Sequence, residues 1–96
     1  MTVRDTIVEK LALRFGPAHL EVIDESHQHH GHAGWREGGE THFLVRIATQ
    51  HLAGLTRVAQ HRAVMAALDV ELKGGVHALA IEVLPLGGPY ELPNKI

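Results

Sequence analysis

The fold is decided by THFLVRIAT, the stretch of residues 41–49. Apolar residues alternate with other types along it, which predicts a β-strand with one fully apolar face. That apolar face is made of Phe43, Val45 and Ile47. The other face carries His42 and Arg46, so we expect it to face solvent.

Two further stretches have the composition of strands and flank this one in the chain. Residues 19–25 (HLEVIDE) precede it and alternate in the same way, and residues 76–84 (VHALAIEVL) follow it. The first two strands are joined directly by a loop, which favours antiparallel pairing. The third follows a helix, and a strand–helix–strand connection favours parallel pairing. The sequence therefore predicts a three-stranded mixed sheet.

Two segments with helical spacing complete the fold. Residues 3–15 begin after a capping box, Thr2 and Asp5, and end at Gly16-Pro17. Residues 57–73 are expected to form the second helix, with a short separate turn of helix at residues 54–60. The apolar stripe predicted for this second helix is Val58, His61, Met65, Leu68 and Leu72. The predicted fold class is α+β, with the helices covering one face of the sheet.

Length and composition narrow the possible classes. With 96 residues, the chain has room for one small domain, and a net charge of −2 argues against a dedicated polyanion binder. There is no cysteine, so disulfides, thiolate nucleophiles and a self-contained Cys-ligated cluster are excluded. We find no apolar run of membrane-spanning length and no signal-peptide pattern, and expect a cytoplasmic protein without membrane contact.

Histidine is concentrated in the loop between the first two predicted strands. SHQHHGHAG, residues 26–34, holds four of the nine histidines: His27, His29, His30 and His32. Imidazole is the commonest protein ligand for borderline metals, and small neighbours would let several rings converge on one ion. A stand-alone zinc or nickel site in this loop is therefore one hypothesis for function.

Several short motifs occur in a fixed order along these elements. They are Asp24-Glu25-Ser26-His27, Gly31-His32-Ala33-Gly34, Gly39-Glu40-Thr41-His42-Phe43, Gly54-x-Thr56-Arg57, His61-Arg62 and Val76-His77-Ala78-Leu79-Ala80-Ile81. Together they resemble the BolA family, from roughly the first helix to Leu84. The resemblance implies a KH-like fold, α-β-β-α-(α)-β, for a domain at residues 1–85, followed by a flexible C-terminal tail at residues 86–96.

The resemblance also implies a function. BolA-like proteins are non-enzymatic adaptors that pair with monothiol glutaredoxins and share a glutathione-linked 2Fe–2S cluster, in iron–sulfur assembly or iron homeostasis. The ligands carried over are His77, which opens the last strand, and His32 in the loop, with His29 as its competitor. We expect His61 to orient a neighbouring ligand instead of binding metal itself. A chain without cysteine depends on its partner for sulfur ligands.

DNA-binding regulation is the main alternative, because some bacterial BolA proteins are described as transcriptional regulators. Its residues would be Arg57, His61 and Arg62 on the second helix. Gln60 stands where a further basic residue is common in the family, which would remove one phosphate contact. A weak homodimer of the free chain is a further hypothesis. No residue pattern indicates an enzyme, since Ser26-His27 lacks a third group to orient the base.

Overall fold

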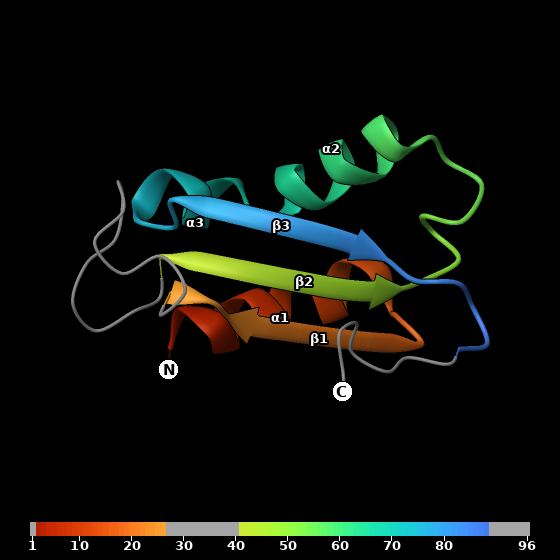
Figure 1. Cartoon of the computed structure of the whole chain (residues 1–96), viewed down its shortest axis with the longest axis horizontal. Helices are drawn as coiled ribbons and strands as arrows, with labels where there is room; N and C mark the ends of the chain where they lie inside the picture. Colours follow the sequence, from red (N-terminus) through yellow and green to blue (C-terminus); the bar gives the residue numbers. More distant parts are fainter. Residues whose placement is uncertain (1, 27–40, 89–96) are drawn as a thin grey trace.

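A computed structural model describes residues 2–26 and 41–88 of the chain. The elements follow the order α1 (Val3–Phe15), β1 (His19–Asp24), β2 (His42–Ala48), α2 (Arg57–Ala67), α3 (Asp69–Gly74) and β3 (Ala78–Val83). Figure 1 shows the three strands side by side in one layer, with the helices behind them. The predicted α+β class and helix-covered mixed sheet are confirmed.

The central strand of the sheet is β2, as its sequence pattern predicts. The strand order is β1-β2-β3. β1 pairs with β2 antiparallel, so that Val22 lies opposite Val45, and β3 pairs with β2 parallel, so that Ile81 lies beside Val45. The connection through α2 and α3 returns the chain to the starting end of β2, which allows the parallel pairing.

The hydrophobic core lies between the sheet and the helices. Phe43, Val45 and Ile47 are at most 1% exposed, which confirms the apolar face of β2. The other buried apolar side chains that pack with them are Ile7, Leu11, Phe15, Val22, Leu52, Val64, Leu68, Val76 and Ile81. Both strands next to β2, the helices α1 and α2 and the segment before α2 contribute to this core, so it forms only when the sheet is assembled.

The second helical segment differs from its prediction. Helix α2 runs unbroken from Arg57, so no separate helix forms at residues 54–60. The break is at Leu68 instead, where φ of −111° and ψ of 22° leave the α-helical region. The Leu68 side chain is only 1% exposed, and its burial holds the chain at this bend before α3 begins.

The predicted apolar stripe of the second helix is wrong in part. Val58 is 58% exposed and Met65 38% exposed, whereas Val64 is fully buried. The stripe drawn through Met65 is therefore rotated by one residue from the face that meets the sheet. Alanines at positions 63 and 67 flank Val64 and pack against the core, and their small size conceals this face in the sequence.

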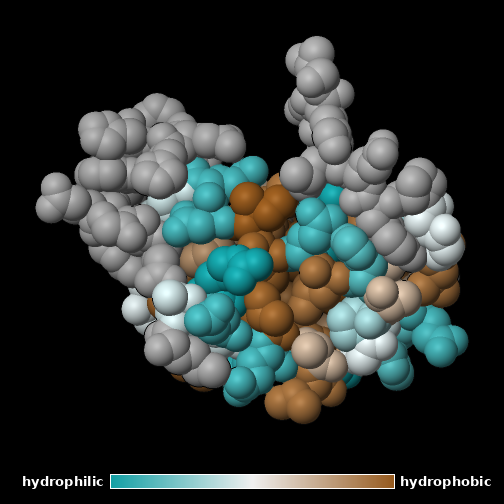
Figure 2. Space-filling view, turned by 90° about the horizontal axis from the view of Figure 1, so that it is seen from below, coloured by the Kyte–Doolittle hydropathy of each residue, from teal (hydrophilic) through white to brown (hydrophobic). Residues whose placement is uncertain are grey.

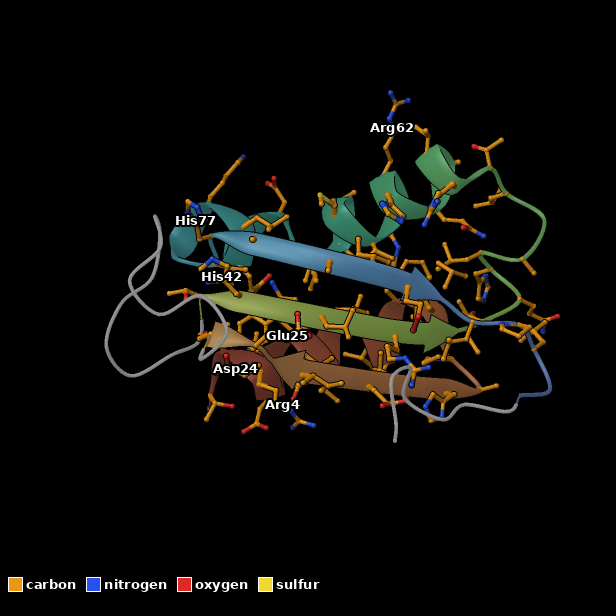
Figure 3. All side chains as sticks on the ribbon, in the orientation of Figure 1. Arg4, Asp24, Glu25, His42, Arg62 and His77 are labelled. Carbon is orange, nitrogen blue, oxygen red and sulfur yellow. The ribbon has the colours of Figure 1, made fainter. Side chains whose placement is uncertain are left out.

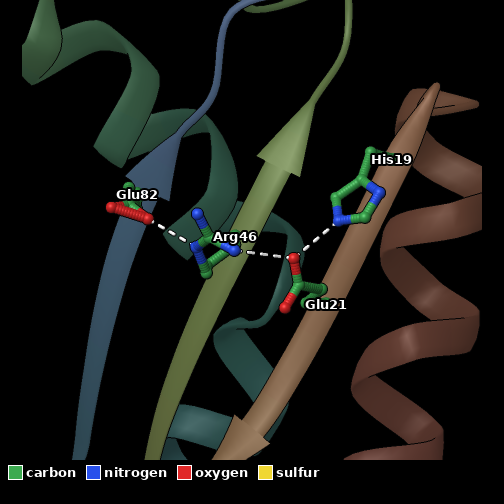
Figure 4. Close-up of polar contacts among 4 residues, drawn as sticks. All are labelled: His19, Glu21, Arg46 and Glu82. Carbon is green, nitrogen blue, oxygen red and sulfur yellow. Dashed lines mark hydrogen bonds and ion pairs between the residues drawn. The ribbon is translucent and has the colours of Figure 1, made fainter. Parts of the chain in front are cut away.

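The open face of the sheet is less exposed than its polar residues predict. Arg46 is 3% exposed and His42 is 4% exposed. The Arg46 guanidinium donates from Nε to Glu82 at 2.5 Å and from Nη1 to Glu21 at 2.8 Å, so it joins all three strands (Figure 4). The Glu82 hydrogen bond, supported by the charge of Glu21, raises the pKa of Arg46 above its ordinary value. The two ion pairs offset the cost of burying the charged guanidinium.

One edge of the sheet is β1, and a helix side chain protects part of it. Arg4 reaches from α1 and donates from Nε to the backbone oxygen of Val22 at 2.7 Å. Seen from the side of α1 and β1, apolar side chains gather between polar ones (Figure 2). A charged side chain bonded to an edge strand reduces the tendency of that edge to pair with another chain.

The first helix begins with the predicted capping box. The Thr2 hydroxyl accepts from the Asp5 amide at 3.0 Å, and the Asp5 carboxylate accepts from the Thr2 amide at 3.3 Å. These hydrogen bonds lower the pKa of Asp5 from its ordinary value of 3.8. Within the described residues, no helix is both long and apolar enough to cross a membrane.

Replacement of Thr2 by alanine is expected to lower the free energy of unfolding by about 1 kcal/mol, because the N-cap is lost.

The cap also predicts a pH dependence of stability, since the pKa of Asp5 is lower in the folded chain than in the unfolded chain. Its stabilisation is present above pH 3.8 and is lost as the pH falls through the lowered pKa. Urea unfolding should show a higher free energy of unfolding for the wild type than for Asp5→Asn at neutral pH, and this difference should disappear in strong acid. A difference that widens in acid would contradict this assignment.

Candidate metal-ligand site at the start of the second and third strands

A buried serine joins the two ends of the histidine-rich loop. Ser26, 1% exposed, accepts hydrogen bonds at Oγ from the backbone amides of Thr41 at 3.0 Å and His42 at 3.3 Å. The Glu25 amide donates to the His42 oxygen at 2.8 Å, which continues the pairing of β1 with β2 up to this point. Ser26 and Thr41, the described residues on either side of positions 27–40, therefore lie next to each other.

The first residue of β3 and the residue before it bind to Thr41 as well. The amides of His77 and Ala78 both donate to the Thr41 oxygen, at 2.7 and 3.1 Å. His77 thus lies immediately before β3, beside the residue at which the loop returns to the sheet. Figure 3 shows His77 and His42 together at this end, with Asp24 and Glu25 on the neighbouring strand end.

The two histidines at this end have different environments. His77 is exposed, whereas His42 is buried and its Nδ1 lies 2.8 Å from the Thr41 hydroxyl. Their ring centroids are 5.4 Å apart, with the ring planes inclined at 52°. An exposed imidazole can bind a metal ion that another molecule also binds, but a buried imidazole held by a hydrogen bond cannot. His77 is therefore the better ligand of the two.

The sequence-predicted ligands are placed only in part. His77 lies where the prediction requires it, but His32 and its competitor His29 fall outside the described residues, as do His27 and His30. Neither the His77–loop ligand pair nor the stand-alone loop metal site is thereby tested. In residues 2–26 and 41–88 there is no group of three or more side chains that could hold a metal ion.

His61 is half-buried on α2, away from the start of β3 in the chain. The ring that contacts His77 is that of His42, on β2. The role expected for His61 beside a ligand is not tested by this contact and stays a prediction. We missed His42 because its alternation places it on the polar face of β2. The parallel register of β2 and β3 would have indicated the contact. His42 lies beside Ala78, and His77 is the residue directly before Ala78.

The residues of the DNA-binding alternative lie on α2. Arg57 and Arg62 are exposed, and Arg62 projects away from the sheet in Figure 3. At about 100° per residue, these two side chains lie about 140° apart around the helix. They do not form one continuous basic face, and the exposed Val58 and Met65 interrupt the surface around them.

The described residues at this end of the sheet offer one exposed imidazole. Imidazole nitrogen is a common metal ligand, and the position of His77 next to a strand gives it a fixed backbone. No thiolate is available anywhere in the chain. The site can supply nitrogen ligands but no sulfur.

Substitution of Ser26 by alanine is expected to lower the free energy of unfolding by about 1–3 kcal/mol, because two buried amides lose their acceptor. Hydrogen exchange should accelerate at the Thr41 and His42 amides. The Leu84 amide, which donates to the Ile47 oxygen at 2.8 Å near the other end of β2, is the internal control and should be accelerated less. Unchanged exchange at Thr41 would show that Ser26 does not hold the loop ends together.

Comparison with known proteins agrees with the motifs. The family model described as BolA-like protein matches residues 11–86. A Sinorhizobium protein, named only as an uncharacterized protein in the cobS 5' region, is 49% identical over 90 residues, which cover 93% of this chain and 97% of that protein. The DNA-binding transcriptional regulator BolA of Escherichia coli is 40% identical over 81 residues, which cover 84% of this chain and 73% of that protein.

A solved structure gives the same result for the fold. The BolA domain of SufE1 from Arabidopsis thaliana superimposes with a TM-score of 0.79 at 38% identity, over 90% of this chain and 94% of that domain. The family match and the structural similarity both extend over most of the chain. The chain belongs to the BolA family.

Proposed function

We propose that this chain is a non-enzymatic adaptor that binds a monothiol glutaredoxin and shares a glutathione-linked 2Fe–2S cluster with it, for iron–sulfur assembly or iron homeostasis. The observation that carries the proposal is the position of His77. Its ring is exposed, and its amide is bonded to Thr41, the residue at which the histidine-rich loop rejoins the sheet.

The length of the loop allows a second ligand from it to approach His77. A chain extends by at most about 3.5 Å per residue, so position 32 cannot lie more than about 20 Å from Ser26. Ser26 is itself bonded to Thr41, and Thr41 is bonded to His77. We assign His32 as this second ligand from its place in the family motif, with His29 as the alternative.

The division of ligands follows from composition. A chain with no cysteine can offer only nitrogen and oxygen ligands, so the cluster sulfur ligands must come from the partner thiol and from glutathione. Two neutral imidazoles in place of thiolates reduce the negative charge at the cluster, which raises its reduction potential. The chain thereby supplies two cluster ligands, and the reduction potential distinguishes the shared cluster from one held by thiolates alone.

Co-expression with a candidate monothiol glutaredoxin tests the proposal. A coloured complex containing one copy of each chain should elute as one species, with visible circular dichroism different from that of the glutaredoxin alone. A glutaredoxin whose cluster spectrum and elution are unchanged by this chain would contradict the proposal.

DNA binding remains a second candidate function, favoured by the exposure of Arg57 and Arg62 and by the name of the Escherichia coli relative. The split basic surface and the net charge of −2 predict weak, salt-sensitive binding. Specific retardation of promoter DNA by the chain alone at physiological salt would favour this function over the adaptor role.

A further inference from the structure

The buried His42 has no assigned role, yet it contacts the ring of the proposed ligand. We infer that His42 is a positioning residue, whose ring face restricts the orientations of the His77 imidazole and holds it ready for a metal centre. The inference rests on the proposed function, because His77 must be a ligand for its orientation to matter.

The first support is how firmly His42 itself is held. It is 4% exposed, its amide donates to Ser26 Oγ at 3.3 Å, and its Nδ1 lies 2.8 Å from Thr41 Oγ1. A hydrogen bond at one ring nitrogen fixes the rotation of an imidazole about its bond to Cβ. His42 is therefore a rigid surface, not a second mobile ring.

The second support is the freedom that His77 would otherwise have. It lies before the first residue of β3 and is exposed, so side-chain packing does not fix it from most directions. The ring of His42 approaches it with centroids 5.4 Å apart at an inclination of 52°, a tilted geometry that aromatic rings favour. The contact with His42 excludes some rotamers of His77 and leaves those that point outward available.

The third support is that the same residues anchor the loop. Ser26 and Thr41 hold His42, and they also form the two ends of the segment that contains His32. One buried hydrogen-bonded group therefore sets the position of His77 and of both loop ends. Such supporting residues commonly change metal affinity by about 10–100-fold when they are replaced.

Two substitutions separate the ring from its hydrogen bond. His42→Asn keeps a polar atom near Thr41 but removes the ring, whereas His42→Phe keeps the ring face and loses the bond. Ile47→Val on the same strand is the control for loss of stability, because Ile47 lies five residues away in the core. Unfolding curves for all three variants allow comparison at known stability.

The first measurement uses the isolated chain without metal. NMR of the ¹⁵N-labelled histidine rings should show the His77 resonances shifted and averaged in His42→Asn, and close to wild type in His42→Phe. The second measurement is the release of the cluster from the glutaredoxin complex to a chelator. Release should be about tenfold faster in His42→Asn, while His42→Phe and Ile47→Val should stay within about threefold of wild type.

The results distinguish the inference from the proposal beneath it. Wild-type release and unchanged His77 resonances in His42→Asn would overturn the role of His42, and so would equal acceleration in His42→Asn and His42→Phe. Failure of the wild-type chain to form any cluster complex would instead overturn the adaptor function. The NMR result on the isolated chain would then still report whether His42 orients His77.

Discussion

Replacement of His77 by alanine is expected to abolish the cluster spectrum that this chain confers on a monothiol glutaredoxin. The imidazole is the only described side chain at the loop-bearing end of the sheet that is both exposed and a preferred iron ligand. Its backbone amide makes the contact with Thr41, so alanine keeps the hydrogen bond and removes only the ring. We therefore expect loss of the cluster without loss of the fold.

His51→Ala is the matched control, because it removes an exposed histidine from the segment between β2 and α2. Its complex should keep the wild-type absorption and circular dichroism. Iron and sulfide content per complex, measured together with the spectra, distinguishes a lost cluster from an altered one. An unchanged spectrum in the His77→Ala complex would rule out His77 as a ligand.

Phe43→Ala is expected to be the most destabilising single change, at about 3–5 kcal/mol. Phe43 is 1% exposed at the centre of a sheet whose three strands all meet at β2. The side chains around a deleted core ring relax only partly into the cavity it leaves, which is why the loss is large. For a domain of this size the change corresponds to a fall in melting temperature of about 15–30 °C.

Leu13→Ala provides the comparison, since Leu13 is 83% exposed on α1. Its effect should stay within about 0.5 kcal/mol, as for most surface changes. Thermal unfolding followed by far-ultraviolet circular dichroism measures both variants. Similar melting temperatures for Phe43→Ala and Leu13→Ala would contradict the assignment of the core.

Most of the fold can be predicted from the sequence because its period-two and helical patterns are strong. The alternation through residues 41–49, the capping box at Thr2 and the glycines that end α1 and α3 all have local causes. The break at Leu68 has none, since leucine is a good helix former and the bend depends on burial against the sheet. Tertiary packing overrides local preference there.

The site could be predicted only where one residue carries the signal. His77 is recognisable from its place before an apolar strand, within a family motif. The role of Ser26 and the burial of His42 depend on contacts between residues 15 and 16 positions apart in the chain. Burial of Arg46 depends likewise on carboxylates from two other strands. Such pairings require the register of the sheet, which alternation alone does not determine.

The central claim is that this chain gives a histidine nitrogen to a cluster shared with its partner. Pulsed electron paramagnetic resonance of the reduced complex, with ¹⁵N-histidine only in this chain, tests it most directly. We predict strong ¹⁵N couplings from directly bound imidazole, lost in His77→Ala and kept in His51→Ala. A reduced cluster without any strong ¹⁵N coupling would show that all its ligands come from elsewhere, and would contradict the claim.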